Sequence, residues 1–142
     1  MNFRNLIASL AVLGSLAAPA FADDELYNNQ FGGKPGMAKI THEMMVGVLA
    51  DPRIKDFFAK TDIERLEFLL AEQFCELVSG PCKYSGRDMK TVHRGEKINT
   101  AHFNFLAEHL QVAMENNGVP TWAQNKLIAK LAPMHRDVTE PR

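Results

Sequence analysis

The chain has 142 residues and a formal net charge of −1, with 46% hydrophobic and 23% charged residues. This length suits one hydrophobic core, and the near-neutral charge gives no reason to expect nucleic-acid binding. The sequence has no internal repeat and no low-complexity tract. We therefore expect one globular unit rather than a repeat array.

The first 22 residues have the pattern of a secretory signal peptide. Arg4 precedes an apolar run over residues 6–18, and Ala20-Phe21-Ala22 offers a small-x-small cleavage site. The run is too short to span a membrane. Cleavage after Ala22 removes Arg4 and lowers the formal charge from −1 to −2. We expect the mature chain, residues 23–142, to be one domain without a membrane span, exported to the periplasm.

Every periodic segment of the mature chain has helical spacing, and no run of alternating β-branched residues occurs, so we predict an all-α fold. The first helix covers residues 35–51, with Pro35 in its first turn. The second covers residues 61–79, begins with a capping-box pattern of Thr61 and Glu64, and ends before Gly80-Pro81.

Three further helices follow. A short helix covers residues 88–93, and the next is capped by Asn99 or Thr100 and ends at the "NNGVP" stretch. The last begins near Thr121 and contains Pro133, where we expect a bend. The connection over residues 79–99 is long for a small bundle, and the apolar stripes are wide. Both features would fit a core that surrounds something apolar.

The two cysteines, Cys75 and Cys82, are separated by six residues, and Gly80-Pro81 lets the chain turn back between them. An exported protein can form this disulfide, but spacing alone does not guarantee the required geometry. A disulfide and free thiols therefore both stay open. The pair is too small for a zinc site, and the C-x-x-C-H signature of c-type haem is absent.

Several motifs recur in order along the chain with matching intervals. They are Tyr27, Gly32-Gly33, "VLADPRIKDFFAKTD", "GPCKYSGRDMKTVHRG", "INTAHF", "GVP" and "LAPM". Together they resemble the truncated haemoglobins, most closely group I, over nearly the whole mature chain. This resemblance implies a two-over-two helical sandwich, a shortened globin fold, with one haem b (protoporphyrin IX iron).

The resemblance gives a role to His93, which matches the proximal ligand of haem iron in the family. Neutral imidazole is a suitable donor for iron, and its second nitrogen then needs a hydrogen-bond acceptor that fixes the ring. Without the resemblance, a histidine here would be interpreted as a surface or capping residue. Phe58 matches the phenylalanine that packs on the haem face. Thr61 and Arg65 match positions that reach haem propionates. Further apolar residues match the haem pocket: Phe74, Met89, Val92, Ile98, Phe103, Leu106, Leu127 and Leu131.

The other histidines have weaker signals. His42 lies opposite the main apolar stripe of its helix, and we expect His102 and His109 to point to solvent. Some relatives join a histidine in the region of His135 covalently to a haem vinyl group. The register at His135 is shifted by one residue, so no such link is expected here.

The sequence departs from the family on the distal side of the haem. Many group I members stabilise oxygen with a tyrosine on the second helix and a glutamine on the distal helix. Here Met45 stands at the tyrosine position and Leu66 and Leu70 at the ligand-facing positions, with Leu69 at another position that is polar in some relatives. We expect an apolar distal pocket that binds carbon monoxide and nitric oxide well and holds oxygen weakly. Gln73 is the one nearby amide that could turn inward.

The resemblance thus implies a haem protein that reversibly binds diatomic gases at iron, and not necessarily an enzyme. Alternatives remain: a redox protein with Met45 as second iron ligand, a haem enzyme such as a nitric oxide dioxygenase or a peroxidase, and a haem-free helical domain. A reductase partner stays open.

Overall fold

The computed structural model describes residues 25–139, so the predicted signal peptide, residues 1–22, lies outside the described residues. Throughout the described part all regular structure is helical and no strand occurs. The α-helices are α2 (Gly33–Ala50), α3 (Ile63–Leu77), α4 (Met89–His93), α5 (Thr100–Asn116), α6 (Thr121–Leu131) and α7 (His135–Val138). A π-helical segment (Leu26–Gln30) and two 3-10 turns (Lys55–Phe58 and Ala132–Met134) complete the set.

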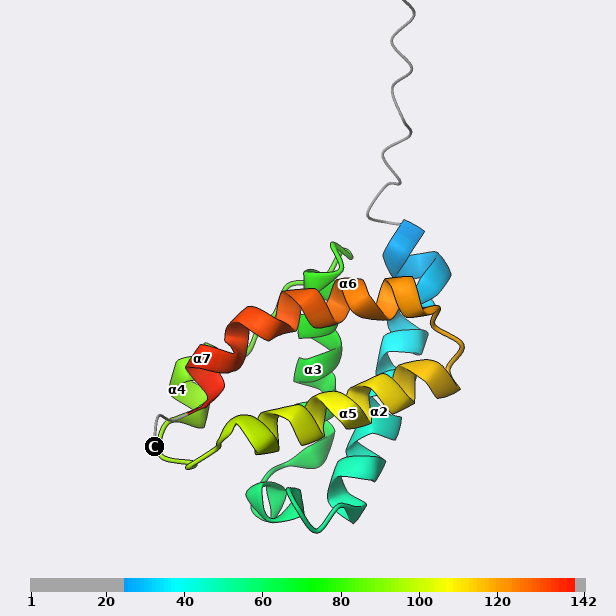
Figure 1. Cartoon of the computed structure of the whole chain (residues 1–142). Coiled ribbons are helices and arrows are strands. Elements are labelled where there is room, and N and C mark those ends of the chain that lie inside the picture. Colours follow the sequence, from blue (N-terminus) through cyan, green and yellow to red (C-terminus); the bar gives the residue numbers. More distant parts are fainter. Residues whose placement is uncertain (1–24, 140–142) are drawn as a thin grey trace, which may run out of the picture.

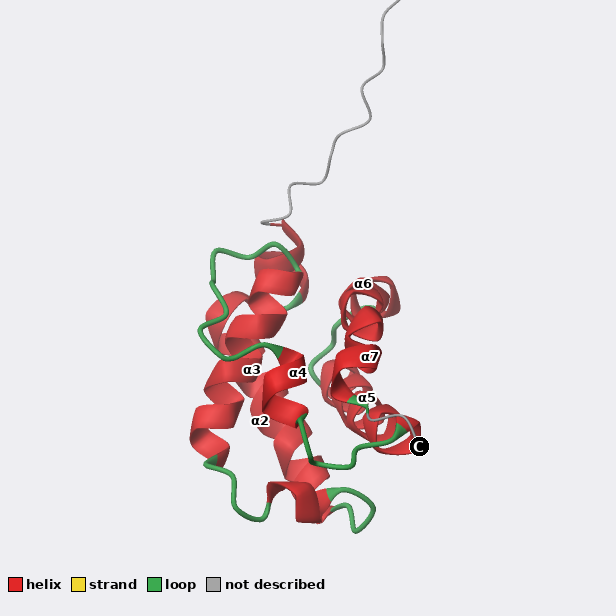
Figure 2. Ribbon diagram, turned by 90° about the vertical axis from the view of Figure 1, so that its left-hand side faces the viewer, coloured by secondary structure: helices red, strands yellow, loops and turns green. Residues whose placement is uncertain are grey.

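The helices form two layers. Figure 2 shows α2 and α3 on one side and α5 and α6 on the other, with α7 continuing from α6. Helix α2 packs against both α3 and α5, and Figure 1 shows α5 and α6 crossing in front of α2 and α3. The predicted two-over-two helical sandwich is confirmed.

The core lies between the layers and is built mainly on α2. The apolar positions Met37, Ile40, Met44 and Val48 recur every three or four residues, so they lie on one face of the helix, and each is at most 1% exposed. Leu110, Met114 and Leu127 from the second layer pack against this face. The same contacts leave α3 and α4 only partly covered, which opens space beside them.

Three local features set the helix ends. Asp62, not Thr61, is the N-cap of α3, because its carboxylate accepts the backbone N–H of Arg65 at 3.0 Å. The expected Thr61–Glu64 capping box was therefore wrong. Asn99 caps α5 and forms a capping box with His102. The chain switches to a 3-10 turn at Pro133, as the missing N–H of proline predicts.

Among residues 25–139, no helix is both long and apolar enough to cross a membrane.

Candidate functional site

A cavity of about 600 Å³ lies beside α3, α4 and α5. This volume is within the range of small-molecule and cofactor sites. The wall includes Met45 from α2 and Val138 from α7, so every layer contributes to it. The lining residues are Met45, Ile54, Phe57, Phe58, Thr61, Asp62, Arg65, Leu66, Leu69, Leu70, Gln73, Tyr84, Ser85, Gly86, Arg87, Met89, Val92, His93, Glu96, Ile98, His102, Phe103, Leu106 and Val138.

His93 ends α4 and lines this cavity. Its Nδ1 lies 2.7 Å from the backbone carbonyl oxygen of Met89, one helical turn earlier. A carbonyl can only accept, so Nδ1 carries the proton and donates it. In the neutral ring Nε2 then keeps a free lone pair. The histidine is therefore an oriented nitrogen donor in a mostly apolar cavity.

The four residues predicted for the distal wall all line the same cavity as His93. Met45 comes from α2 and is fully buried, while Leu66, Leu69 and Leu70 come from α3 and are half-buried. None of these side chains carries a hydrogen-bond donor. The part of the cavity wall that they form is therefore apolar.

Gln73 is the polar side chain that α3 places deepest in this wall, and it is 7% exposed. Its amide Nε2 donates to the thioether of Met89 on α4 at 3.5 Å. One of its two N–H groups is thus directed toward the helix of His93.

The exposed side of the cavity carries charge. Thr61, Arg65 and Arg87 line the cavity and are exposed to solvent. Guanidinium groups at such an edge suit the carboxylates of a bound molecule. Arg65 and Thr61, which the resemblance matches to propionate-binding positions, thus lie among the exposed lining residues, and Arg87 adds a second cation there.

The predicted pocket residues divide into two groups. Phe58, Met89, Val92, Ile98, Phe103 and Leu106 line the cavity. Phe74 and Leu127 instead belong to the hydrophobic core cluster, where they are 3% and 0% exposed, and Leu131 is a partly buried residue that packs against this cluster. The structure therefore places these three behind the cavity wall. Sequence periodicity does not separate wall from core, because both positions require apolar side chains.

His102 lines the cavity and does not point to solvent as expected. Its Nδ1 accepts the backbone N–H of Asn99 at 3.3 Å, and its ring lies 4.8 Å from the ring of Phe57. The capping bond folds the side chain back along the first turn of α5. The Asn99-x-x-His102 spacing was the signal that could have revealed this position.

The remaining histidines do not line the cavity, although the ring of His135 packs edge-on against Phe103 of the wall at 5.1 Å. His42 is exposed and lies 3.1 Å from Glu67. His109 was expected at the surface, but it is largely buried, and its Nε2 lies 2.8 Å from the carboxylate of Asp51. His135 Nε2 lies 3.1 Å from the hydroxyl of Thr100.

Asp51 is the centre of a polar cluster at the end of α2. Asp51 is 7% exposed, and its carboxylate accepts from the guanidinium of Arg53 at 2.6 Å and contacts His109. Arg53 first, and His109 with it, hold the pKa of Asp51 well below its usual range. This cluster fixes the turn that leads to Phe57 and Phe58 in the cavity wall.

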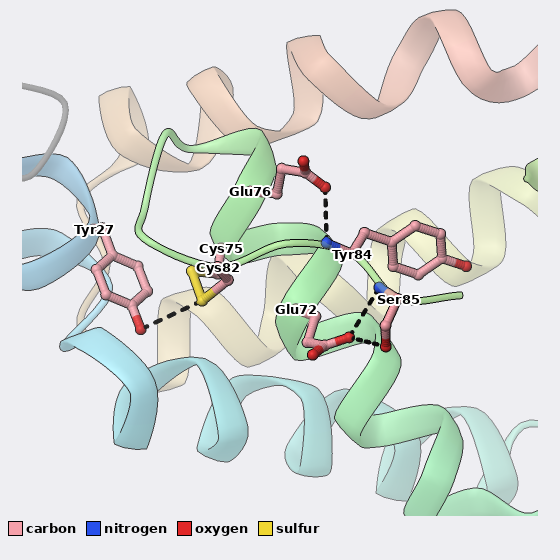
Figure 3. Close-up of a disulfide and its surroundings, with 7 residues drawn as sticks. All are labelled: Tyr27, Glu72, Cys75, Glu76, Cys82, Tyr84 and Ser85. Atoms are coloured by element: carbon pink, nitrogen blue, oxygen red, sulfur yellow. Dashed lines mark hydrogen bonds between the residues drawn. A yellow bond between two sulfur atoms is a disulfide. The ribbon is translucent and has the colours of Figure 1, made fainter. Parts of the chain in front are cut away.

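The loop before α4 forms another part of the wall and is tied to α3 (Figure 3). Cys75 on α3 and Cys82 in the loop form a disulfide. Glu76 accepts the backbone N–H of Tyr84 at 2.9 Å, and this bond lowers the pKa of Glu76. Burial raises the pKa of Tyr84, whose hydroxyl donates to the carbonyl of Arg87 at 2.9 Å. Sequence analysis did not identify Tyr84 as a wall residue, because the loop has no periodic pattern.

The site fits a haem group. The cavity offers apolar surfaces for a flat macrocycle, an imidazole nitrogen whose lone pair is freed by the bond to Met89, and guanidinium groups at the exposed edge. The same cavity thus provides each type of contact that haem requires.

Comparisons with known proteins agree with this geometry. A sequence profile of the family described as bacterial-like globin matches residues 25–140. The group 1 truncated hemoglobin GlbN of Mycolicibacterium paratuberculosis is 32% identical over 110 residues, which are 78% of this chain and 81% of that protein. GlbN of a Nostoc species is 32% identical over 94 residues, 66% of this chain and 79% of that protein.

Solved structures show the same fold. The truncated hemoglobin of Tetrahymena pyriformis in the Fe(III) form has a TM-score of 0.76 and 25% identity, and the match covers 81% of this chain and 98% of that one. The 2/2 hemoglobin of Synechococcus sp. PCC 7002 has a TM-score of 0.74 at 22% identity, covering 80% of this chain and 96% of that one, and supports the fold alone. The chain therefore belongs to the bacterial-like globin family and is a haem-binding group 1 truncated haemoglobin.

Proposed function

We propose that this haemoglobin binds haem b through His93 and reversibly binds oxygen, carbon monoxide or nitric oxide beside Met45, Leu66 and Leu70. The observation that carries the proposal is the bond from His93 Nδ1 to the Met89 carbonyl, because it leaves Nε2 free as a donor inside the cavity. When bound, haem supplies an iron centre that takes a diatomic gas as a ligand.

Two kinds of cavity side chain would hold the haem. Phe58, Val92 and Phe103 offer apolar contact to a macrocycle, while Arg65 and Thr61 at the exposed edge suit its carboxylates.

The distal wall determines which gases are held well. Oxygen as a ligand draws partial negative charge and gains from a hydrogen-bond donor in a low-dielectric pocket, whereas carbon monoxide depends on such a donor much less. Met45, Leu66 and Leu70 provide no donor. We therefore propose easier oxygen release and faster autoxidation than in relatives with a polar distal side.

Absorption spectra test this proposal. The purified protein is recorded oxidised, reduced, and reduced under carbon monoxide, beside His93→Ala and the control His102→Gln. His102 also lines the cavity, and a glutamine at its position keeps the capping-box pattern. We expect a Soret band that shifts with carbon monoxide and is lost or altered only in His93→Ala. Equal spectra for the wild type and His93→Ala would overturn the assignment.

A redox function is the second candidate, since Met45 is fully buried and lines the same cavity as His93. A thioether can bind haem iron and would then occupy the gas site. A far-red charge-transfer band in the oxidised protein would identify this state. A nitrate assay with nitric oxide and a reductant would identify a dioxygenase, which requires a reductase partner.

We also propose that the protein acts in the periplasm. Two observations support this: the signal-peptide pattern of residues 1–22 and the disulfide between Cys75 and Cys82, which persists in oxidising compartments. Cell fractionation with N-terminal sequencing of the recovered protein tests it. A mature protein beginning at Asp23 is expected, and a full-length cytoplasmic chain would contradict it.

A further inference from the structure

The loop of residues 82–87 is a wall segment of the cavity whose position depends on α3. Tyr84, Ser85, Gly86 and Arg87 line the cavity. Four attachments hold the loop: the disulfide at Cys82, the ion pair of Lys83 with Glu76 at 3.1 Å, the bond from Tyr84 N–H to Glu76, and the bonds of Ser85 to Glu72 at 3.1 Å and 2.5 Å. Figure 3 shows the disulfide and the bonds of Tyr84 and Ser85 to Glu76 and Glu72 on α3.

The attachments differ in strength. Ser85 is exposed, and the ion pair of Lys83 with Glu76 joins a side chain that is 91% exposed to one that is 37% exposed. Exposed bonds of this kind exchange readily with water and contribute little. The disulfide is covalent and does not exchange with water. It is therefore the attachment on which the closed position of the loop mainly depends.

The two sulfur atoms differ in access. Cys75 is 1% exposed and belongs to the core. Cys82 is half-buried and lines a second groove of about 440 Å³ between α2 and α3, together with Lys34. Lys34 and Lys83 line this groove together with Glu64, Glu67 and Glu72, so exposure rather than charge distinguishes the two sulfur atoms. A reductant would therefore reach the sulfur of Cys82 first.

We propose that Cys75–Cys82 is a thiol-exchange site at which a dithiol reductant releases the cavity wall formed by residues 84–87. One thiolate of the dithiol attacks the sulfur of Cys82, the Cys75–Cys82 bond breaks, and Cys75 leaves as a thiolate that takes up a proton. The second thiolate attacks the mixed disulfide and releases Cys82, which is then protonated. The dithiol becomes a disulfide, and its two electrons and two protons end on Cys75 and Cys82.

This inference rests on the proposed haem site for its functional consequence. With the disulfide open, the loop keeps the part-buried bond of Tyr84 to Glu76 and the exposed contacts of Lys83 and Ser85. The wall then opens more often, and a molecule held in the cavity escapes more easily. The availability of a dithiol reductant around the protein would thereby determine how long the globin retains its haem.

The test measures haem transfer from the holoprotein to excess apomyoglobin, before and after treatment with dithiothreitol. We expect transfer to become about tenfold faster once two thiols per chain are counted, since part of the ring-closure entropy is lost. The variant Cys75→Ala/Cys82→Ser should transfer haem fast with or without dithiothreitol. This variant also separates the loop effect from any action of dithiothreitol on iron.

A second measurement does not need haem. Trypsin can cleave the loop after Lys83 and Arg87, and we expect both cuts to become faster after reduction. Glu72→Gln, which weakens the hold on Ser85 alone, should speed cleavage of the oxidised protein to a smaller extent. If haem does not bind, the proposed function fails, and the cleavage rates still decide this inference.

Two results would overturn the inference. One is a disulfide that dithiothreitol does not open in the folded protein, as seen by thiol counting. The other is complete reduction with unchanged haem transfer and unchanged cleavage at Lys83 and Arg87.

Discussion

Replacing Met45 by tyrosine should slow oxygen dissociation strongly. Met45 is fully buried and lines the cavity with Leu66 and Leu70, so a hydroxyl placed there would be screened from water. A hydrogen bond to a charged acceptor contributes about 1.5–3 kcal/mol, which corresponds to about a 10- to 100-fold slower dissociation of oxygen. Carbon monoxide carries less charge, so its dissociation rate should change about threefold or less.

Stopped-flow mixing of the oxygenated protein with dithionite measures this rate. The matched control is Met45→Phe, which introduces the same ring without the hydroxyl. Steric effects act on both variants, whereas only tyrosine supplies the donor. Equal oxygen dissociation rates for Met45→Tyr and Met45→Phe would refute the idea that the missing donor weakens oxygen binding.

Three further predictions concern stability. Arg53 lowers the pKa of Asp51 in the folded protein, so the stability that Asp51 contributes is complete above its unfolded pKa and is lost as pH falls. Between pH 5 and 2, the urea midpoint of unfolding should therefore fall more steeply for the wild type than for Asp51→Asn. Parallel curves for the two proteins would contradict this. Ser79 has φ 61°, so Ser79→Gly should stabilise the fold by about 1 kcal/mol in urea titrations, whereas a loss of stability would show that its side chain is needed. Asp62→Ala should lower the melting temperature by about 4 °C through loss of the helix cap, with Thr61→Ala unchanged; the reverse order would make Thr61 the cap.

The main helices could be predicted because their apolar positions repeat with helical spacing and their ends carry strong signals. Met37 to Val48 form one face of α2, and Pro133 marks the change to a 3-10 turn. The predicted cap of α3 was wrong because two adjacent residues can both cap a helix. Thr61 and Asp62 are both good caps, and only the backbone path selects Asp62.

The candidate site could be predicted only where a motif carried it. His93 was identified by its motif, and the distal residues were identified by their positions on the helices. The loop residues Tyr84 and Ser85 could not be found, because a wall built from an irregular loop depends on tertiary contacts with Glu76 and Glu72. The sequence also did not identify His102 as a wall residue. Its capping bond to Asn99 is a local contact, whereas its place in the cavity wall depends on tertiary packing.

The acceptor for His93 is a peptide carbonyl rather than a side chain. No substitution at position 89 other than one that breaks the helix removes it, so the orientation of the ring tolerates sequence change at Met89. The acceptor is also neutral. A carboxylate in its place would draw the Nδ1 proton more strongly and make the ring more electron-donating toward a metal. The backbone of a five-residue helix thus holds the imidazole through a neutral acceptor, which leaves it a weaker donor than a carboxylate partner would.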